Sequence, residues 1–149
     1  MMDLTGYMTI NGTDIWTEYG VFLGEIEAGG HVNMDALLRV PKAKEITKVD
    51  FRERTGVELP DNPNVKLSSI ERTLQFWLRS NNKYNRLQKY QEFMSLITSG
   101  MLTISIKDYR TYKMVYQDMP IEPDWYVSYE GDRFYAFFQV KFLEPQPSI

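Results

Sequence analysis

The stretch Phe134-Tyr-Ala-Phe-Phe-Gln-Val-Lys-Phe142 decides the fold class of this chain. Its even positions are all apolar, namely Phe134, Ala136, Phe138, Val140 and Phe142. Side chains alternate between the two faces of a strand, so the pattern predicts a β-strand with one fully buried face. The other face starts with Tyr135 and Phe137 before it turns polar. A strand that is apolar on both faces needs cover on both, from its own fold or from a neighbouring subunit.

Size and composition narrow the classes of function. The 149 residues predict one domain spanning positions 1–149. The chain contains 0 cysteines, which excludes disulfides, thiolate zinc sites and cysteine nucleophiles. The net charge of -3 argues against general nucleic-acid binding but is compatible with a surface that DNA passes without being held. No run approaches the roughly 20 apolar residues that span a bilayer, so we expect no membrane partner and no signal peptide.

The remaining chain contains strand patterns separated by turn residues. Asn11-Gly12 predicts a tight hairpin, and long strands are expected over 45–59 and 65–79. One helix is expected at 83–98, because apolar residues recur there at helical spacing: Leu87, Tyr90, Met94 and Ile97. These elements predict a mainly β (α+β) fold, an antiparallel β-sandwich or open barrel of about eight strands with one flanking α-helix.

The sequence contains little that indicates catalysis. His31 is the 1 histidine and lies in a Gly-rich loop, and no serine has a nucleophile-elbow context. Asp124, Glu130 and Asp132 flank a predicted hairpin beside aromatic residues, as paired glycosidase acids would, but acids at turns more often cap the turn and face water. We therefore expect no enzyme activity, no catalytic residue, no metal ligand and no cofactor.

Two groups of residues are candidates for contacts. The aromatic candidates are Trp77, Trp125, Tyr135 and Phe137, which fit either a subunit interface or stacking on sugar rings. The charged candidates alternate in sign along one predicted strand and are Lys48, Asp50, Arg52, Glu53 and Arg54. Opposed charges of this kind set register between identical subunits in a ring, although a solvated face explains them equally well.

Several stretches resemble phage and prophage tail proteins of the tail-tube and distal-tail group. They are the opening 9–16 followed by Tyr19-Gly-Val-Phe-Leu23, the segment Pro41–Glu45 leading into Val49–Glu53, the helix with Tyr90, Phe93, Leu96 and Gly100 before Leu102–Ile104, and the tyrosines Tyr109, Tyr112 and Tyr116. The resemblance covers most of the chain and carries no catalytic motif.

The resemblance implies a β-sandwich flanked by one helix that assembles into rings, most often hexameric, which form or cap a tail tube. It implies contacts with other tail or baseplate proteins and with a tape-measure protein, and only transient passage of DNA. It places the protein in the virion tail after synthesis in the bacterial cytoplasm. The alternative function is a carbohydrate-binding β-sandwich module that uses exposed aromatic residues.

Overall fold

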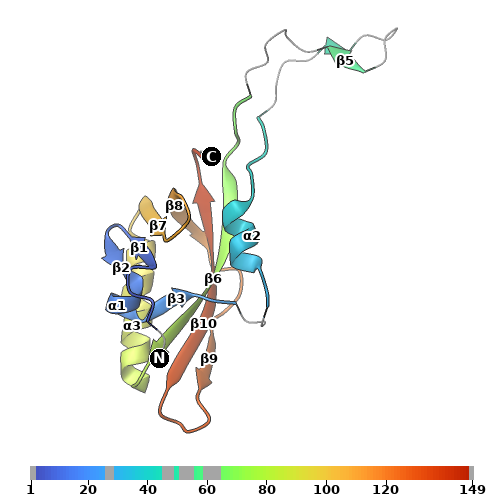
Figure 1. Ribbon diagram of the computed structural model, residues 1–149. Coiled ribbons are helices and arrows are strands. Elements are labelled where there is room, and N and C mark those ends of the chain that lie inside the picture. Colours follow the sequence, from blue (N-terminus) through green and yellow to red (C-terminus); the bar gives the residue numbers. More distant parts are fainter. Residues whose placement is uncertain (1–2, 26–28, 45–48, 51–55, 59–64, 148–149) are drawn as a thin grey trace.

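The computed structural model describes residues 3–25, 29–44, 49–50, 56–58 and 65–147. Within them, eight antiparallel strands form one curled sheet in the order β2-β1-β7-β8-β10-β6-β3, with β9 also paired to β10 (Figure 1). The strands are β1 (Met8–Ile10), β2 (Thr13–Asp14), β3 (Val21–Leu23), β6 (Ile70–Ser80), β7 (Leu102–Ile106), β8 (Thr111–Asp118), β9 (Asp124–Val127) and β10 (Phe134–Glu144). The predicted fold class, a mainly β fold with an antiparallel sandwich or open barrel of about eight strands and a flanking helix, is confirmed in its open-barrel form, and two further short helices are present.

The longest pairing in the sheet joins β10 to β6, in unbroken register from Phe134 opposite Ser80 to Glu144 opposite Ile70. Its inner face is made by the even positions of both strands, and these side chains are buried: Leu74, Phe76, Leu78, Ala136, Phe138, Val140 and Phe142. The alternation read from the sequence thus sets which face is interior. The core continues under the smaller strands through residues such as Met8, Ile104 and Met114.

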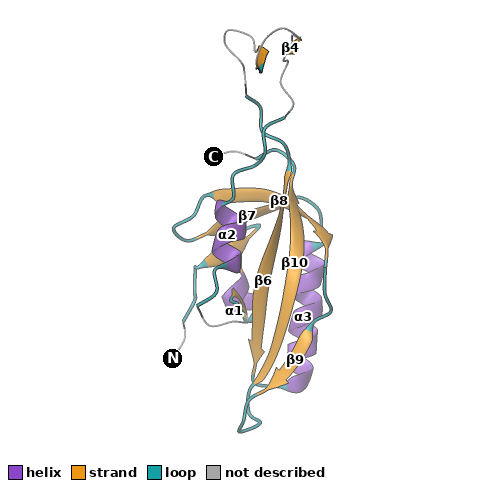
Figure 2. Ribbon diagram, turned by 90° about the vertical axis from the view of Figure 1, so that its right-hand side faces the viewer, coloured by secondary structure: helices purple, strands orange, loops and turns teal. Residues whose placement is uncertain are grey.

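Helix α3 (Lys83–Ile97) covers this inner face (Figure 2). The ring of Phe93 lies 5.6 Å from that of Phe76 and 5.8 Å from that of Phe138. The side chain of Asn82 caps the helix by accepting hydrogen bonds from the backbone N–H groups of Tyr84 and Asn85 at 2.8 and 3.3 Å. The helix predicted at 83–98 is therefore confirmed.

The apolar residues whose spacing predicts α3 are buried to different degrees, since Ile97 is buried while Tyr90 and Met94 are half-buried. Leu87 is 49% exposed, whereas Arg86, one residue earlier, is 8% exposed.

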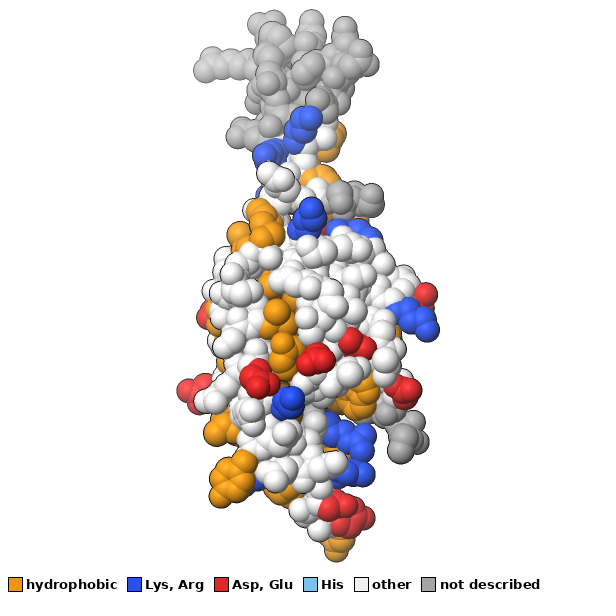
Figure 3. Space-filling view, turned by 90° about the vertical axis from the view of Figure 1, so that its left-hand side faces the viewer, with side chains coloured by type: hydrophobic (Ala, Val, Ile, Leu, Met, Phe, Trp, Pro, Cys, Tyr) orange, Lys and Arg blue, Asp and Glu red, His pale blue; other side chains and the backbone are white. Residues whose placement is uncertain are grey.

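Figure 3 shows the side of the molecule that carries α1, β1, β2 and α3, where hydrophobic side chains reach the surface between charged ones.

Two shorter helices accompany α3: the residues 34–38 indicate one helical turn from their sequence, whereas no sequence pattern indicates a helix at 15–19. Helix α1 (Ile15–Tyr19) follows β2 directly, begins at an Asp14 side chain that accepts from the backbone N–H of Trp16 at 3.2 Å, and ends at Gly20 with φ 68°. Helix α2 (Val32–Leu38) follows the Gly-rich loop. Within the described residues, no helix has the length and apolar character needed to cross a membrane.

The prediction of one strand over 45–59 is wrong, because the two described pieces of this stretch are separate strands that pair antiparallel with each other. These strands are β4 (Val49–Asp50) and β5 (Val57–Glu58), which are drawn apart from the main sheet (Figures 1 and 2). At the base of the β4–β5 pair, Lys44 N–H donates to Lys66 O and Ser68 N–H to Lys42 O, both at 2.7 Å. The strand expected over 65–79 accordingly starts later, at Ile70.

Candidate functional site: an aromatic groove beside a free sheet edge

The outer face of the β6–β10 pair carries a cluster of aromatic rings centred on Trp77. The ring centroid of Trp77 lies 5.0 Å from that of Phe137, 5.5 Å from that of Tyr126 and 6.4 Å from that of Tyr135. An open groove of about 510 Å³ runs over the cluster and is lined by Phe22, Trp77, Tyr126 and Tyr135. Helix α3 lies on the opposite, inner face of the pair. Among the described residues, no helix lies over the aromatic cluster.

Strand register brings the four lining residues together. Phe22 of β3 is the partner of Trp77 in β6, and Tyr126 of β9 is the partner of Tyr135 in β10. Cross-strand partners on one face lie close enough for aromatic rings to touch. Gly24 leaves room for the indole, since a Cβ there would come within 2.7 Å of Trp77 Cδ1.

The groove has little polar chemistry. The indole N–H of Trp77 donates to the backbone oxygen of Glu25 at 3.3 Å, so its one polar atom is already used. The tyrosine hydroxyls of Tyr126 and Tyr135 are the remaining polar side-chain atoms of the lining. A surface of this chemistry suits apolar or ring-shaped groups, which can stack on its aromatic rings.

Strand β9 borders the groove and presents an open edge. All four of its residues are exposed, and among the described strands it pairs only with β10. Its alternation splits the side chains between two faces, so that Tyr126 joins the groove while Trp125 lies on the inner side against Tyr90 at 5.3 Å. Unpaired main-chain groups on such an edge are able to accept another strand.

Arg86 supports β9 from the helix side. Its Nη1 donates to the backbone oxygens of Tyr126 and Tyr135 at 3.1 and 3.2 Å. Its guanidinium lies over the rings of Trp125 and Phe134, at 5.0 and 5.4 Å from their centroids. Burial lowers the pKa of Arg86. The Arg86 guanidinium thus holds β9 on β10 through backbone carbonyls and aromatic ring faces. Among the described residues it has no carboxylate partner.

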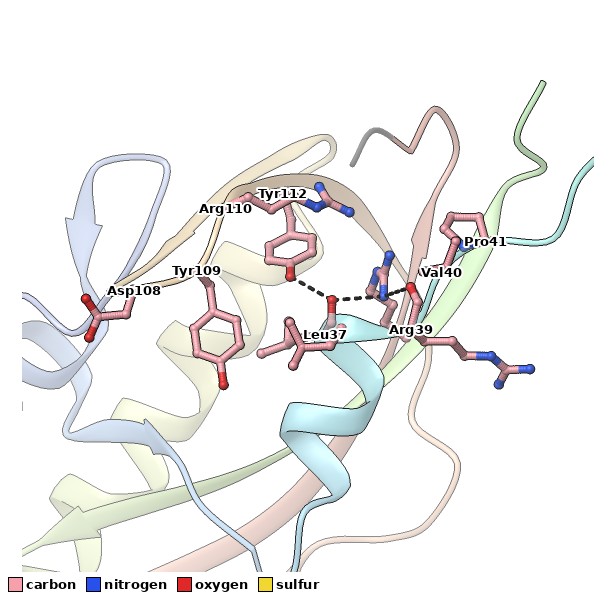
Figure 4. Close-up of a pocket in the computed structure, with 10 residues that line it drawn as sticks. Leu37, Arg39, Val40, Pro41, Asp108, Tyr109, Arg110 and Tyr112 are labelled. Atoms are coloured by element: carbon pink, nitrogen blue, oxygen red, sulfur yellow. Dashed lines mark hydrogen bonds between the residues drawn. The ribbon is translucent and has the colours of Figure 1, made fainter. Parts of the chain in front are cut away.

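A second hollow of about 560 Å³ lies where α2 ends against the sheet (Figure 4). Arg72 of β6 donates to the backbone oxygens of Leu37 and Arg39 at 3.2 and 3.1 Å, and Tyr112 Oη donates to Leu37 O at 2.7 Å. These donors satisfy carbonyls that a helix C-terminus leaves free.

Glu144 completes this cluster and is almost fully buried. Its Oε1 accepts from Arg72 Nη2 at 2.9 Å and from Arg110 Nη2 at 3.0 Å, and its Oε2 accepts from Arg110 Nη1 at 2.9 Å. Arg110 also stacks over the ring of Tyr112 at 4.0 Å. The cluster ties α2, β8 and the end of β10 together, which is a structural task.

The structure separates the aromatic candidates predicted from the sequence. Trp77 and Tyr135 line the groove, Phe137 lies beneath them at 1% exposure, and Trp125 belongs to the other face. Sequence reasoning missed Phe22 and Tyr126. Both are aromatic residues in strand-like segments, a signal too general to single them out.

The charged candidates fall outside the described part of the chain. Lys48, Arg52, Glu53 and Arg54 lie among residues that the structure does not describe, and Asp50 is described only as part of the β4 backbone. Their proposed role in ring contacts remains a prediction.

The hairpin acids do not converge on a cleft. Asp124, Glu130 and Asp132 are all exposed, and Asp132 accepts a hydrogen bond from Ser128 Oγ at 3.0 Å in the way that turn acids usually do. No group of metal-ligating side chains occurs in the described regions, and His31 is exposed at the start of α2.

Comparisons with known proteins show a likeness among solved structures. No protein-family model matches the chain, and no curated protein does so either. Among solved structures it is similar to the Dit protein of phage SPP1, described as a paradigm of the hub adsorption apparatus in phages that infect Gram-positive bacteria. The TM-score is 0.50 at 14% identity over 91% of this chain. The likeness shows a shared fold, and the chain spans 48% of the length of that protein.

Proposed function

We propose that this protein is a structural subunit of a phage-tail-like particle that self-assembles into rings forming or capping the tail tube. The observation that carries the proposal is the fold shared with a phage hub protein. An aromatic groove and an open strand edge on one molecule support it, since exposed apolar surface of this kind marks places where proteins meet.

The proposal includes the setting in which the subunit works. Its partners are copies of itself, most often six in such rings, together with other tail or baseplate proteins and a tape-measure protein. DNA passes through the ring without specific binding, which suits a chain with a net charge of -3. The protein acts in the virion tail after synthesis in the bacterial cytoplasm, and without enzymatic activity.

Native mass spectrometry and light scattering over a wide range of protein concentration test this proposal. We expect a closed ring whose population grows with concentration, as mass action requires, and ring-shaped particles in negative-stain images. A chain that stays monomeric at every concentration, alone and mixed with the products of neighbouring tail genes, contradicts the proposal.

A carbohydrate-binding module is the second candidate, because Trp77, Tyr126 and Tyr135 form an exposed aromatic surface. A glycan array is the direct measurement. Binding that is lost in Tyr135→Ala but kept in Trp16→Ala supports this function, since Trp16 lies outside the groove lining. An array without signal, in protein shown to be folded by circular dichroism, removes it.

A further inference from the structure

Exposed apolar residues gather on two elements that lie on opposite edges of the β6–β10 pair. In the described part of the chain, thirteen large hydrophobic residues are exposed, and five of them fall between positions 121 and 129, on or beside β9: Ile121, Trp125, Tyr126, Val127 and Tyr129. Four more lie on or just after α2: Val32, Met34, Leu38 and Val40. We call these the β9 edge and the α2 edge.

The two edges face away from each other. Helix α2 lies along β6, where the Asn33 side chain exchanges hydrogen bonds with the backbone of Gln75, donating from Nδ2 at 3.0 Å and accepting at 2.6 Å. Strand β9 pairs with β10. Figure 2 shows α2 on one side of the β6–β10 ribbon and β9 on the other. When two different surfaces lie on opposite sides of a molecule, one surface of each copy can contact the other surface of the next copy. Such a head-to-tail contact produces a ring when the rotation from one copy to the next adds up to a full turn.

The edges also differ in charge. Residues 118–132 contain no lysine or arginine and carry five exposed carboxylates: Asp118, Glu122, Asp124, Glu130 and Asp132. Among the described residues, the end of α2 and the base of the β4–β5 pair beside it carry four exposed basic side chains and two exposed carboxylates, those of Asp35 and Glu71. The basic residues are Arg39, Lys42, Lys44 and Lys66. Complementary potentials of this kind select partners and fix their orientation.

We propose that the α2 edge of one copy docks on the β9 edge of the next copy, in a head-to-tail contact that repeats around the ring. The inference rests on the proposed function and names the surfaces by which the ring is made. Apolar side chains of α2 cover Trp125, Tyr126 and Val127 at the centre of the contact, while basic and acidic side chains pair around its rim.

Cysteine cross-linking tests the contact directly, because the natural chain contains 0 cysteines. Leu38→Cys and Val127→Cys place one thiol on each edge, at positions that are 59% and 56% exposed. We expect a disulfide dimer when the two single variants are mixed and oxidised, and a ladder ending at the ring size for the double variant. Leu38→Cys mixed with Ser105→Cys, an exposed position on β7, is the matched control and should stay uncross-linked.

Charge reversal provides an independent measurement of the same contact. Glu122→Lys with Asp124→Lys should weaken self-association about tenfold or more, as should Arg39→Glu with Lys42→Glu, and mixing the two variants should restore pairing. Circular dichroism confirms that each variant is folded.

The outcomes separate this inference from the proposed function. Cross-linking of Val127→Cys with itself indicates a two-fold contact between β9 edges and overturns the inference. Rings of the unmodified protein with no Leu38–Val127 cross-link overturn it while leaving the proposed function in place. A protein that forms no assembly at any concentration, alone or with its tail neighbours, overturns both.

Discussion

Replacing Glu144 by glutamine tests whether the buried ion pairs stabilise the junction of α2, β8 and the end of β10. Glu144 is 2% exposed and lies 2.9 Å from both Arg72 Nη2 and Arg110 Nη1. Arg72 is 1% exposed and contacts no other carboxylate among the described residues. The variant keeps the side-chain volume and leaves the buried guanidinium without an anion.

The expected loss of stability follows from the burial of the pair. Removing one partner of a buried ion pair costs about 3–5 kcal/mol, and we expect about 3 kcal/mol because glutamine still offers one acceptor oxygen. For a chain of this size that corresponds to a Tm lowered by about 6–12 °C. Urea unfolding at pH 7 followed by circular dichroism measures the change in the free energy of unfolding.

The same two strands supply a matched control. Glu71 pairs with Lys141 at 3.3 Å, but its side chain is 52% exposed, so Glu71→Gln should cost only about 0–0.5 kcal/mol. Arg72→Met should cost less in the Glu144→Gln background than in the unmodified protein, because the arginine charge has then lost its partner already. If Glu144→Gln and Glu71→Gln lower stability equally, the reasoning about burial is refuted.

Three further changes probe the helices and the buried tyrosines. Asn82→Ala should lower the free energy of unfolding by about 1 kcal/mol because it removes the α3 cap, whereas Asn82→Asp should change it by only a few tenths of a kcal/mol. Equal losses of the two variants in urea unfolding would contradict a stabilising role of the cap. Asn33→Ala should cost about 2–3 kcal/mol and speed hydrogen exchange at the Gln75 amide, and unchanged exchange would contradict this. Burial raises the pKa of Tyr90 and of Tyr112, although Arg110 and Arg72 oppose the rise at Tyr112. The folded state therefore binds these protons more tightly, and its stability should hold below about pH 10 and fall as pH rises above it. Tyr112→Phe should reduce that slope in urea titrations, and an unchanged slope would contradict the assignment.

The parts of the fold that follow from periodic burial were predictable. The alternation predicts the inner face of β10, where Ala136, Phe138, Val140 and Phe142 are buried and only Phe134 at the start of the strand is half-buried. The spacing of apolar residues and the asparagines before it located α3 within one residue at its C-terminal end. In both cases the same physical cause, removal of apolar side chains from water, creates the sequence pattern and the structure.

Arg86 and α1 escaped prediction for identifiable reasons. A search for apolar spacing selects Leu87 over Arg86, yet the planar guanidinium of Arg86 finds two ring faces and two carbonyls inside the fold. Helix α1 is one short turn fixed by its Asp14 cap and by Gly20, and is too short for a periodic pattern to register.

The groove escaped prediction because it depends on strand register. Phe22 reaches Trp77 only through the pairing of β3 with β6, and Tyr126 reaches Tyr135 only through the pairing of β9 with β10. A shift of one residue would turn either aromatic side chain to the other face. Sequence alone specified the aromatic residues but not the partners that make a site of them.

The buried polar groups of this fold are concentrated where α2 meets the sheet. Asn33 fixes the start of the helix on the β6 backbone, and Arg72 and Tyr112 fix its end through its carbonyls. A helix of seven residues would have little stability by itself, so these tethers determine its position. A surface held in place before contact loses less conformational entropy on docking than one that must first be ordered. If copies dock through the α2 edge as proposed above, these tethers lower the entropic cost of that docking, because they hold the exposed apolar helix in place beforehand.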